Sequence, residues 1–480
     1  MRTRLQVLSS DEREQLHERT LGVLATTGVR VDSAAGRRLL RLAGAEVDES
    51  TAIVRLPPAL VEESLRLCPR AFSLGARRPG WEFPLNAGQT TLVMDGEATR
   101  VIDLRTGDLR AGTHADWIET TRLIDALDDI GVYWAMIDGC LESDSLVGFV
   151  SYNVELAASF TKHVNDSFSR PAWAPWLLEV LQIVCGSRDE IRRRRPYSFL
   201  ITPVSPLVVE RGCIDAWLAL RGWGIPVVVL PMPMMGSTAP GSALATTLLA
   251  NCETIATLCL VQAAEPGTPF IYAPIALTMD PHSGRYAGTT AHSAIGLAGV
   301  EMARHYGLPV MGSASGTDAF LPDEQAGYEK AFSSLLGTLA WPDLMVGPGC
   351  LAGSTILSLA ELLIDVEIFR MSRAVREGLP CEQDDWLDDV LMRRGPGGHF
   401  IAEATTRRNT RRGRFFVPAL GVHDPYETWD AAGRPSVVAE ASARAEEILA
   451  GHRPLPLDDD QRRELERLHA RAGEGREETP

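Results

Sequence analysis

Short apolar runs recur along the middle of the chain. Each is followed by a polar, glycine- or proline-rich stretch and then by a segment with helical periodicity. Seven of these runs lie at 130–137, 163–168, 197–203, 225–231, 269–275, 308–313 and 343–346, and the run Thr91–Met94 is an eighth candidate. Strands that alternate with helices in this way indicate a parallel sheet covered by helices. The pattern therefore predicts an α/β protein, either a closed TIM (β/α)8 barrel or an open doubly wound sheet.

The nucleotide-binding motifs that usually accompany an open sheet are absent from the sequence. No G-x-G-x-x-G follows the first strand, and no G-x-x-x-x-G-K-[ST] phosphate loop is present. The stretch Gly312-Ser-Ala-Ser-Gly is not a G-x-S-x-G nucleophile turn, because Ala314 stands at its centre. These absences favour the barrel over the open sheet.

The segments on either side of the predicted barrel are rich in helices. Helical patterns precede the barrel at 9–28, 33–44 and 57–67. We therefore divide the chain into an α-rich N-terminal segment (1–88), the barrel (89–375) and a helical C-terminal extension with a disordered tail (376–480). Two apolar stretches that flank Gly96 carry a hairpin signal. The extension also holds a basic cluster made of Arg407, Arg408, Arg411, Arg412 and Arg414.

Composition narrows the class of protein. A chain of 480 residues with 45% hydrophobic and 23% charged residues is typical of a soluble globular protein. Its net charge of -16 opposes binding to nucleic acid or to anionic membranes. We see no apolar run of membrane-spanning length and no signal-peptide core, so we expect a cytoplasmic protein. The eight cysteines and ten histidines show no metal-ligand spacing, so we expect free thiols and no protein-ligated metal.

The stretch Pro309–Lys330 carries the strongest functional signal in the sequence. It predicts a buried strand, a polar loop of small residues and then a helix, whose first turn contains Pro322 and Asp323. Functional groups would thus gather at the carboxyl end of a strand, where active sites of parallel barrels lie. A tight connection without chemistry explains these residues equally well.

Several stretches in fixed order resemble one family, the trimethylamine methyltransferase (MttB-type) superfamily of corrinoid-dependent methyltransferases. They are Gly28-Val-Arg-Val-Asp, Leu104-Arg-Thr-Gly-Asp-Leu-Arg, Pro203-Val-Ser-Pro-Leu, Pro231-Met-Pro-Met-Met-Gly-Ser-Thr-Ala-Pro, Asn251-Cys-Glu, Gly316-Thr-Asp-Ala-Phe-Leu-Pro-Asp-Glu-Gln-Ala-Gly-Tyr-Glu-Lys, Gly395-Pro-Gly-Gly-His-Phe and Tyr426-Glu-Thr-Trp. The resemblance implies a TIM barrel, in agreement with the strand pattern. It also implies transfer of a methyl group from a methylated amine to the cobalt of a corrinoid (cobalamin) that a separate small corrinoid-binding protein carries.

The sequence departs from the founding members of that family in one respect. Those members carry pyrrolysine near the position of Phe320 and Leu321, whereas this chain has an ordinary residue at every position. It therefore resembles the non-pyrrolysine branch, which implies a quaternary amine such as glycine betaine as the methyl donor. The alternatives are a methyltransferase with another acceptor, such as a folate, and a quaternary-amine-binding protein without turnover. A homo-oligomer is compatible with all three.

Aromatic residues at strand ends are the candidates for binding a trimethylammonium group, because aromatic faces attract cations. The substrate-binding candidates are Trp134, Tyr272 and Phe320, with Leu321 beside them, and Trp173 and Trp176 are further possibilities. A betaine carboxylate would need an arginine, for which Arg170, Arg285 and Arg407 are available. Ordinary packing is the alternative for each aromatic residue.

Polar residues of the central stretch are candidates for the remaining roles. Asp318 and Gln325 are the catalytic candidates, and the candidates for contact with the corrinoid are Gly312, Ser313, Asp323 and His399. Asp323 fits equally well as a helix cap, and His399 as a residue that closes a turn. Tyr328 and Glu329 lie one helical turn from Gln325, where they are expected to support the loop.

Overall fold

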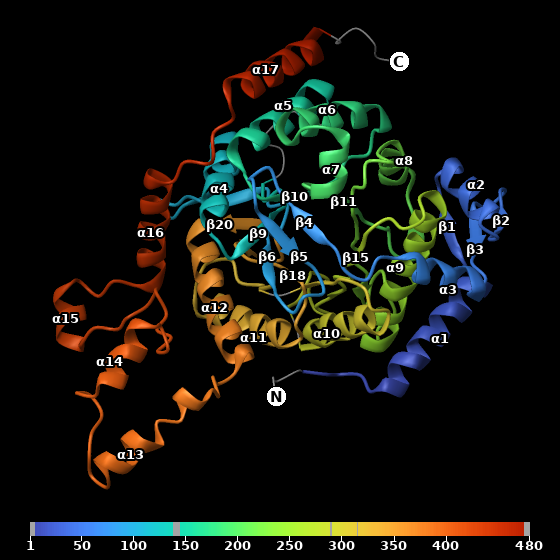
Figure 1. Ribbon diagram of the computed structural model, residues 1–480. Helices are drawn as coiled ribbons and strands as arrows, with labels where there is room; N and C mark the ends of the chain where they lie inside the picture. The colour runs from blue at the N-terminus through green and yellow to red at the C-terminus, as the bar shows by residue number, and fades with distance from the viewer. Residues whose placement is uncertain (1–4, 138–144, 289, 314, 475–480) are drawn as a thin grey trace.

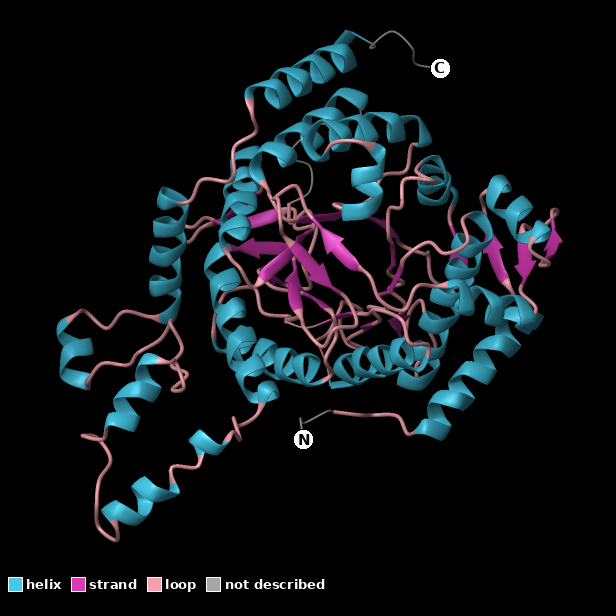
Figure 2. Ribbon diagram, viewed as in Figure 1, coloured by secondary structure: helices cyan, strands magenta, loops and turns pink. Residues whose placement is uncertain are grey.

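Eight parallel strands form a closed ring at the centre of the protein (Figures 1 and 2). The computed structural model describes residues 5–137, 145–288, 290–313 and 315–474. The strands of the ring are β6 (Thr91–Val93), β9 (Ile130–Tyr133), β10 (His163–Asp166), β11 (Tyr197–Ile201), β13 (Val227–Val229), β15 (Phe270–Tyr272), β17 (Met311–Ser313) and β18 (Leu344–Val346). Neighbours in the ring follow chain order, and a bridge between Tyr272 and Val310 closes it between β15 and β17. The predicted TIM barrel is confirmed, and each predicted run supplies one strand.

Helices surround the ring, as Figure 2 shows. They are α4 (His114–Ala126), α5 (Leu146–Ser159), α6 (Ala174–Cys185), α7 (Arg188–Arg194), α8 (Arg211–Ala219), α9 (Ala243–Ala264), α10 (Thr290–His305), α11 (Glu324–Leu339) and α12 (Leu359–Glu377), with a short 3-10 turn η1 (Pro171–Trp173). Polar side chains accept hydrogen bonds from first-turn amides at several starts, including Ser242, Asp323 and Ser358. Such caps satisfy N–H groups that have no partner inside the helix.

Side chains alternate between the barrel interior and the surrounding helices. Interior positions are filled by apolar residues that include Val93, Val132, Leu200, Val228, Ile271, Met311 and Leu344. Residues next to them in sequence, such as Tyr133, face the helices instead. In that outer layer the Tyr152 hydroxyl of α5 donates to Asp166 Oδ2 (2.7 Å), and burial raises the pKa of Asp166 to about 6.

A hairpin closes the N-terminal end of the barrel. Its strands, β4 (Ser73–Gly75) and β5 (Glu82–Pro84), lie across the centre of the ring in Figure 1. Leu74 packs with the interior apolar residues, and Nδ1 of His163, the first residue of β10, lies 2.9 Å from Gly75 O. Gly75 cannot carry a side chain, because a Cβ atom would lie 2.0 Å from Arg194 O. The hairpin thus blocks the barrel end that lies opposite the strand carboxyl ends.

The N-terminal segment contains a small sheet as well as helices. Its elements are α1 (Ser10–Thr26), β1 (Val29–Val31), α2 (Ala34–Leu42), β2 (Glu46–Asp48), β3 (Ile53–Arg55) and α3 (Pro58–Leu67), and β12 (Val208–Val209) completes the sheet. Its helices pack on α9, which has the length and composition of a membrane span, contrary to our reading of the sequence. Of the apolar window of α9, 78% is buried inside the protein.

The hairpin expected around Gly96 is not formed. Strand β6 belongs to the barrel, whereas β7 (Arg100–Ile102) pairs with β8 (Leu109–Ala111) and with β20 (Ile356–Ser358). The remaining short strands are β14 (Met234–Met235), β16 (Leu277–Thr278) and β19 (Cys350–Leu351). They lie in the loops that follow barrel strands and shape the open end of the barrel, which we call the mouth.

The C-terminal extension leaves the barrel and then returns to it (Figure 1). Its elements are η2 (Gln383–Asp385), α13 (Asp388–Arg394), α14 (Ala404–Arg411), α15 (Tyr426–Ala431), α16 (Val437–Gly451) and α17 (Asp459–Glu474). Helix α16 packs on α12 and α4, and α17 packs on α5 and α6. Residues 475–480 of the predicted disordered tail and the thiol of Cys140 fall outside the described residues.

Candidate active site

Loops that follow four barrel strands interlock at the mouth. The loop after β18 joins the loop after β17, because Gly353 N donates to Thr317 O (2.9 Å). The Ser354 hydroxyl donates to the carboxylate of Asp95, which directly follows β6. Gly288 N, in the loop after β15, donates to Asp318 Oδ2 (2.9 Å). Parallel strands bring these loops to one end of the barrel, so residues far apart in sequence form one surface.

Glu329 on α11 fixes the loop after β17. Its carboxylate accepts hydrogen bonds from the Thr317 hydroxyl (2.5 Å), from Asp318 N (2.9 Å) and from Gln325 Nε2 (3.0 Å). The expected support of the loop by Glu329 is therefore present. Gln325 takes part by holding this carboxylate, and Asp318 has its own carboxylate held by the neighbouring loop.

The rim of the mouth exposes apolar side chains. Phe320 and Leu321 are each 54% exposed, and the Arg285 guanidinium lies over the Phe320 ring, 5.3 Å from its centroid. Tyr328 and Phe332 of α11 are also exposed. Phe320 therefore belongs to the outer rim, where it can contact a bound molecule from above.

Asp95 and Trp134 lie together further down, at the ends of the neighbouring strands β6 and β9. Trp134 is half-buried and packs against the apolar residues of the barrel interior. A Cβ atom on Gly96 would lie 3.5 Å from Trp134 Nε1 and 2.1 Å from Ala135 O, so the backbone beside Asp95 approaches the indole closely. Asp95 is half-buried, and Gly96 N also donates to its Oδ1 (3.0 Å). The sequence reasoning missed Asp95, although it directly follows the eighth apolar run.

Tyr286 and His292 extend the same surface and were also missed. Tyr286 packs against two loop glycines: a Cβ atom on Gly316 would lie 2.7 Å from its hydroxyl, and one on Gly353 2.9 Å from its ring. The His292 ring lies edge-on to Tyr286, with centroids 5.7 Å apart. Burial lowers the pKa of His292 to about 4, so this imidazole is neutral at physiological pH.

The mouth carries an excess of negative charge. Burial raises the pKa of Asp95 and of Asp318, and the nearby carboxylates of Glu329 and Asp280 raise that of Asp318 further. The pKa of Tyr286 is raised by burial and by the carboxylates of Asp318, Asp95 and Glu329. Carboxylates that are held in such a field gain stability from any cation that binds among them.

A buried ionic cluster holds α11 in place behind the mouth. The Lys330 ammonium lies 2.6 Å from Asp365 Oδ2 and 3.6 Å from Glu361 Oε1, and all three side chains are almost fully buried. Gly349 N also donates to Asp365 Oδ2 (2.8 Å). Burial raises the pKa of Asp365 to about 7 despite the ammonium. The cluster ties α11 to α12 and to the loop after β18.

Two predicted residues lie elsewhere, so their placement does not support the roles expected for them. The Tyr272 side chain points away from the mouth, and its hydroxyl donates to Asn251 Oδ1 on α9 (2.6 Å). His399 is exposed between α13 and α14, in the segment that reaches away from the barrel in Figure 1. Asp323 accepts from Gln325 N and Ala326 N and thus caps α11.

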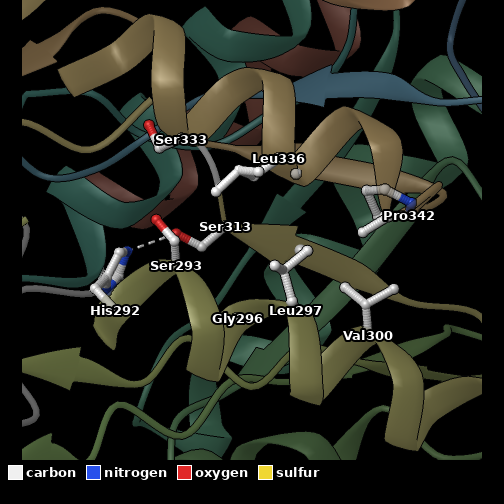
Figure 3. Close-up of a pocket in the computed structure, with 12 residues that line it drawn as sticks. His292, Ser293, Gly296, Leu297, Val300, Ser313, Ser333, Leu336 and Pro342 are labelled. Atoms are coloured by element: carbon white, nitrogen blue, oxygen red, sulfur yellow. Dashed lines mark hydrogen bonds between the residues drawn. The ribbon is translucent and has the colours of Figure 1, made fainter. Parts of the chain in front are cut away.

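The other two residues expected near the corrinoid line a narrow crevice outside the ring. Figure 3 shows it between α10 and α11, where Ser313 Oγ lies 3.3 Å from His292 Nε2. Gly312 allows close packing there, since its Cβ would lie 3.3 Å from Pro342 and Val300. The described residues contain no group of three or more His, Cys, Asp or Glu side chains that could hold a metal ion.

Comparison with known proteins covers almost the whole chain. The family model described as trimethylamine methyltransferase (MTTB) matches residues 1–475. The trimethylamine methyltransferase MttB of Desulfitobacterium hafniense (strain DSM 10664 / DCB-2) is 28% identical over 451 residues, which are 94% of this chain and 90% of that protein. The MttB of Methanosarcina barkeri is 26% identical over 461 residues, 95% of this chain and 93% of the relative.

A relative named for a different substrate is equally similar. The glycine betaine methyltransferase of Desulfitobacterium hafniense (strain Y51) is 27% identical over 473 residues, 97% of each chain. Among solved structures, the monomethylamine methyltransferase of Methanosarcina barkeri aligns over 92% of both chains, with a TM-score of 0.50 and 10% identity. At that identity the structural likeness concerns the fold alone.

Proposed function

Because the chain belongs to the trimethylamine methyltransferase family, we propose that it transfers a methyl group from a quaternary ammonium compound, such as glycine betaine, to a corrinoid carried by a separate small protein. The assignment as a methyltransferase follows from the family. The nature of the donor and of the acceptor is our proposal. The relatives act on different amines at similar identity, so the donor must be argued from the site.

The observation that carries the proposal is the combination of acids and aromatic rings at the mouth. Asp95, Asp318 and Glu329 supply negative charge, and Trp134 and Tyr286 supply rings beside it. A quaternary ammonium carries a fixed positive charge inside an apolar shell of methyl groups. Rings attract such a group by about 0.5–2 kcal/mol each, and carboxylates add a longer-range attraction.

The rim can hold the other end of a betaine. Arg285 is exposed above Phe320 and is the arginine among the predicted candidates that lies at the mouth. A guanidinium binds a carboxylate with two parallel hydrogen bonds. We place the ammonium group beside Trp134 and Asp95 and the carboxylate toward Arg285. This polarity orients the methyl–nitrogen bonds relative to the open end of the barrel.

A quaternary donor also suits the chemistry that this chain can perform. A quaternary ammonium departs as a neutral amine when a nucleophile attacks its methyl carbon. A tertiary amine would have to depart as an amide anion unless it were first protonated or captured by another group. The residue that founding family members use near Phe320 is absent here, so no such capture is available.

The open mouth fits an acceptor that arrives on another protein. A cobalt(I) corrinoid supplies the nucleophile that receives the methyl group. The exposed rim residues Phe320, Leu321, Tyr328 and Phe332 present apolar surface to such a docking partner. With the acceptor in place, this chain's own tasks are to hold the ammonium, orient one methyl group toward the opening and exclude water.

A cytoplasmic location forms part of the proposal. The seven cysteines in the described residues are free thiols, which suits a reducing compartment.

Methyl transfer to reduced cobalamin tests the function directly. The protein is incubated with glycine betaine and cob(I)alamin, and methylcobalamin is followed by its absorbance spectrum. We expect methylcobalamin and dimethylglycine to form in equal amounts, and no product from trimethylamine. Equal rates with both amines would refute the quaternary specificity, and transfer only to a folate would support the alternative acceptor.

A further inference from the structure

The C-terminal extension contains an arm, residues 379–434, that projects from the barrel between α12 and α16 (Figure 1). All of its residues are described, and only Val390 and Glu403 among them are buried. Two hydrogen bonds hold its returning end, from Ala419 N to Glu367 on α12 and from Gly421 N to Glu440 on α16, each 3.0 Å long. The arm therefore has no core of its own.

Large apolar side chains concentrate on this arm. Eleven of the twenty-five large apolar side chains that are exposed among the described residues belong to it. They are Leu379, Trp386, Leu391, Met392, Phe400, Ile401, Phe415, Phe416, Val417, Val422 and Tyr426. A soluble protein rarely leaves so many apolar groups in water on one segment, and such patches mark interaction surfaces. The arm therefore has the composition of a surface that binds another protein.

The distribution of charge along the arm indicates which protein binds to it. Residues 382–392 contain five acids and no base, whereas residues 393–414 contain seven arginines and one acid. The side chains of Arg407, Arg408, Arg411 and Arg412 are exposed and have no partner in the described residues. A segment that is acidic at one end and basic at the other is complementary to an antiparallel copy of itself.

We propose that the arm pairs with the arm of a second copy of this chain in a two-fold symmetric interface. In such an interface a contact between residue i and residue j occurs twice, so each acidic half faces a basic half. The apolar side chains of both arms are buried between them. The net charge of the chain, -16, opposes the association of two copies, so the local match between acidic and basic halves has to overcome this repulsion.

Apolar contact is tested with Ile401→Glu in the full-length protein. Ile401 is 83% exposed in the single chain, so the substitution should not affect folding of the barrel. We expect the wild type to sediment as an even-numbered assembly of the 52.3 kDa chain. In the variant, each copy would bury a charge, and the dissociation constant should rise by about 100-fold or more.

Leu42→Glu is the matched control, because Leu42 on α2 is 80% exposed and lies outside the arm. It should leave the assembly unchanged. A monomeric wild type at about 10 μM, where even a weak specific dimer would be populated, would overturn the proposal. So would an assembly that Ile401→Glu does not weaken.

Charge reversal tests the antiparallel arrangement itself. Arg408→Glu/Arg411→Glu lowers the net charge of the basic half from +6 to +2, and Asp384→Lys/Asp388→Lys changes that of the acidic half from -5 to -1. Each variant alone should associate more weakly than the wild type, because the attraction between the facing halves is then much smaller. A mixture of the two should recover stronger association as a heterodimer, in which opposite charges face each other at both ends.

Recovery in the mixture is specific to arm-to-arm pairing. If the arm docked on another surface of the second copy, mixing the two variants would give no gain over the better of them alone. That result would overturn the arrangement. Arg462→Glu/Arg463→Glu on α17, an exposed pair outside the arm, controls for the change in net charge and should leave association as in the wild type.

Discussion

Replacing Asp95 by asparagine keeps the shape of the side chain at the mouth and removes its charge. The asparagine oxygen can still accept the hydrogen bond from Gly96 N or from Ser354, so the loop after β6 should keep its place. If the ammonium group binds beside Asp95, the variant should lose affinity for a cationic ligand. It should lose little affinity for a ligand of the same shape in which carbon replaces the ammonium nitrogen.

The size of the loss follows from Coulomb's law. The methyl groups of a quaternary ammonium keep its nitrogen about 5 Å from a carboxylate, where two unit charges attract by about 3.3 kcal/mol at an effective dielectric constant of about 20. The nearby Lys330 ammonium and the cost of desolvating Asp95 offset part of this attraction. We expect a net loss of about 1–2 kcal/mol, which weakens binding about 5- to 30-fold.

Calorimetric titration with two ligands isolates the charge. Glycine betaine is compared with 3,3-dimethylbutanoate, in which carbon replaces the ammonium nitrogen. The wild type should bind the betaine more tightly, and Asp95→Asn should shrink this difference. Trp134→Ala should also shrink it, by about 0.5–2 kcal/mol, with Trp134→Phe as the conservative control. An unchanged difference in both folded variants would refute our placement of the ammonium group.

The pH dependence of binding gives a second check on Asp95. Burial raises the pKa of this carboxyl group, and the charged or titratable groups that face it are Lys330, Cys350 and Tyr286. A cation binds the carboxylate form, so the proton must leave when the ligand binds. Affinity for the betaine should therefore rise with pH until the pKa of free Asp95 is passed, and then level off. Asp95→Asn should remove this part of the pH dependence.

Three further predictions concern the groups that hold the site. Lys330→Met leaves Asp365 buried without its cation, so urea unfolding should show a loss of about 3–5 kcal/mol. Because the pKa of Asp365 is already raised to about 7, this loss should be greatest above pH 7 and shrink in acid, where the carboxyl is neutral. Glu329→Gln should raise KM for the amine several-fold with little change in melting temperature, since it loosens the loop after β17 but not the barrel; an unchanged KM would contradict this role. Tyr152→Phe removes a donor to Asp166 and should cost about 1–3 kcal/mol. Because the pKa of Asp166 is raised to about 6, this cost should decrease at pH values below 5, where the carboxyl is neutral. A cost independent of pH would contradict the raised pKa of Asp166.

The barrel could be predicted from the sequence because its strands are apolar on both faces and recur at regular spacing. What local sequence could not show was the partner of the run Thr91–Met94. That run fits both an eighth barrel strand and one strand of a hairpin around Gly96, because a hairpin signal needs only local information. In the structure β6 pairs instead with β9 and β18, and the second of these lies about 250 residues away in the chain.

The site was predicted less completely, for a related reason. Tyr272 and Trp134 both lie at strand ends, but alternate positions of a strand face opposite sides. Ile271 faces the interior, so Tyr272 faces α9, whereas Trp134 follows the helix-facing Tyr133 and packs against interior residues as well as against the outer layer. Which alternate positions of a strand face the interior depends on tertiary packing, which the sequence does not show. Tyr286 was missed because it comes from a long loop whose position depends on three others.

The hairpin of β4 and β5 has a consequence for the order of events in turnover. Because it closes one end of the barrel, the proposed amine site communicates with solvent through the mouth, the same opening at which a methyl acceptor must dock. We expect the donor and the acceptor to use the same opening of the barrel. The amine must then enter before the acceptor docks, and the demethylated product must wait until the acceptor leaves. Such an enzyme follows a compulsory-order scheme. An excess of acceptor protein should slow turnover, because the acceptor then docks on the mouth before an amine has entered.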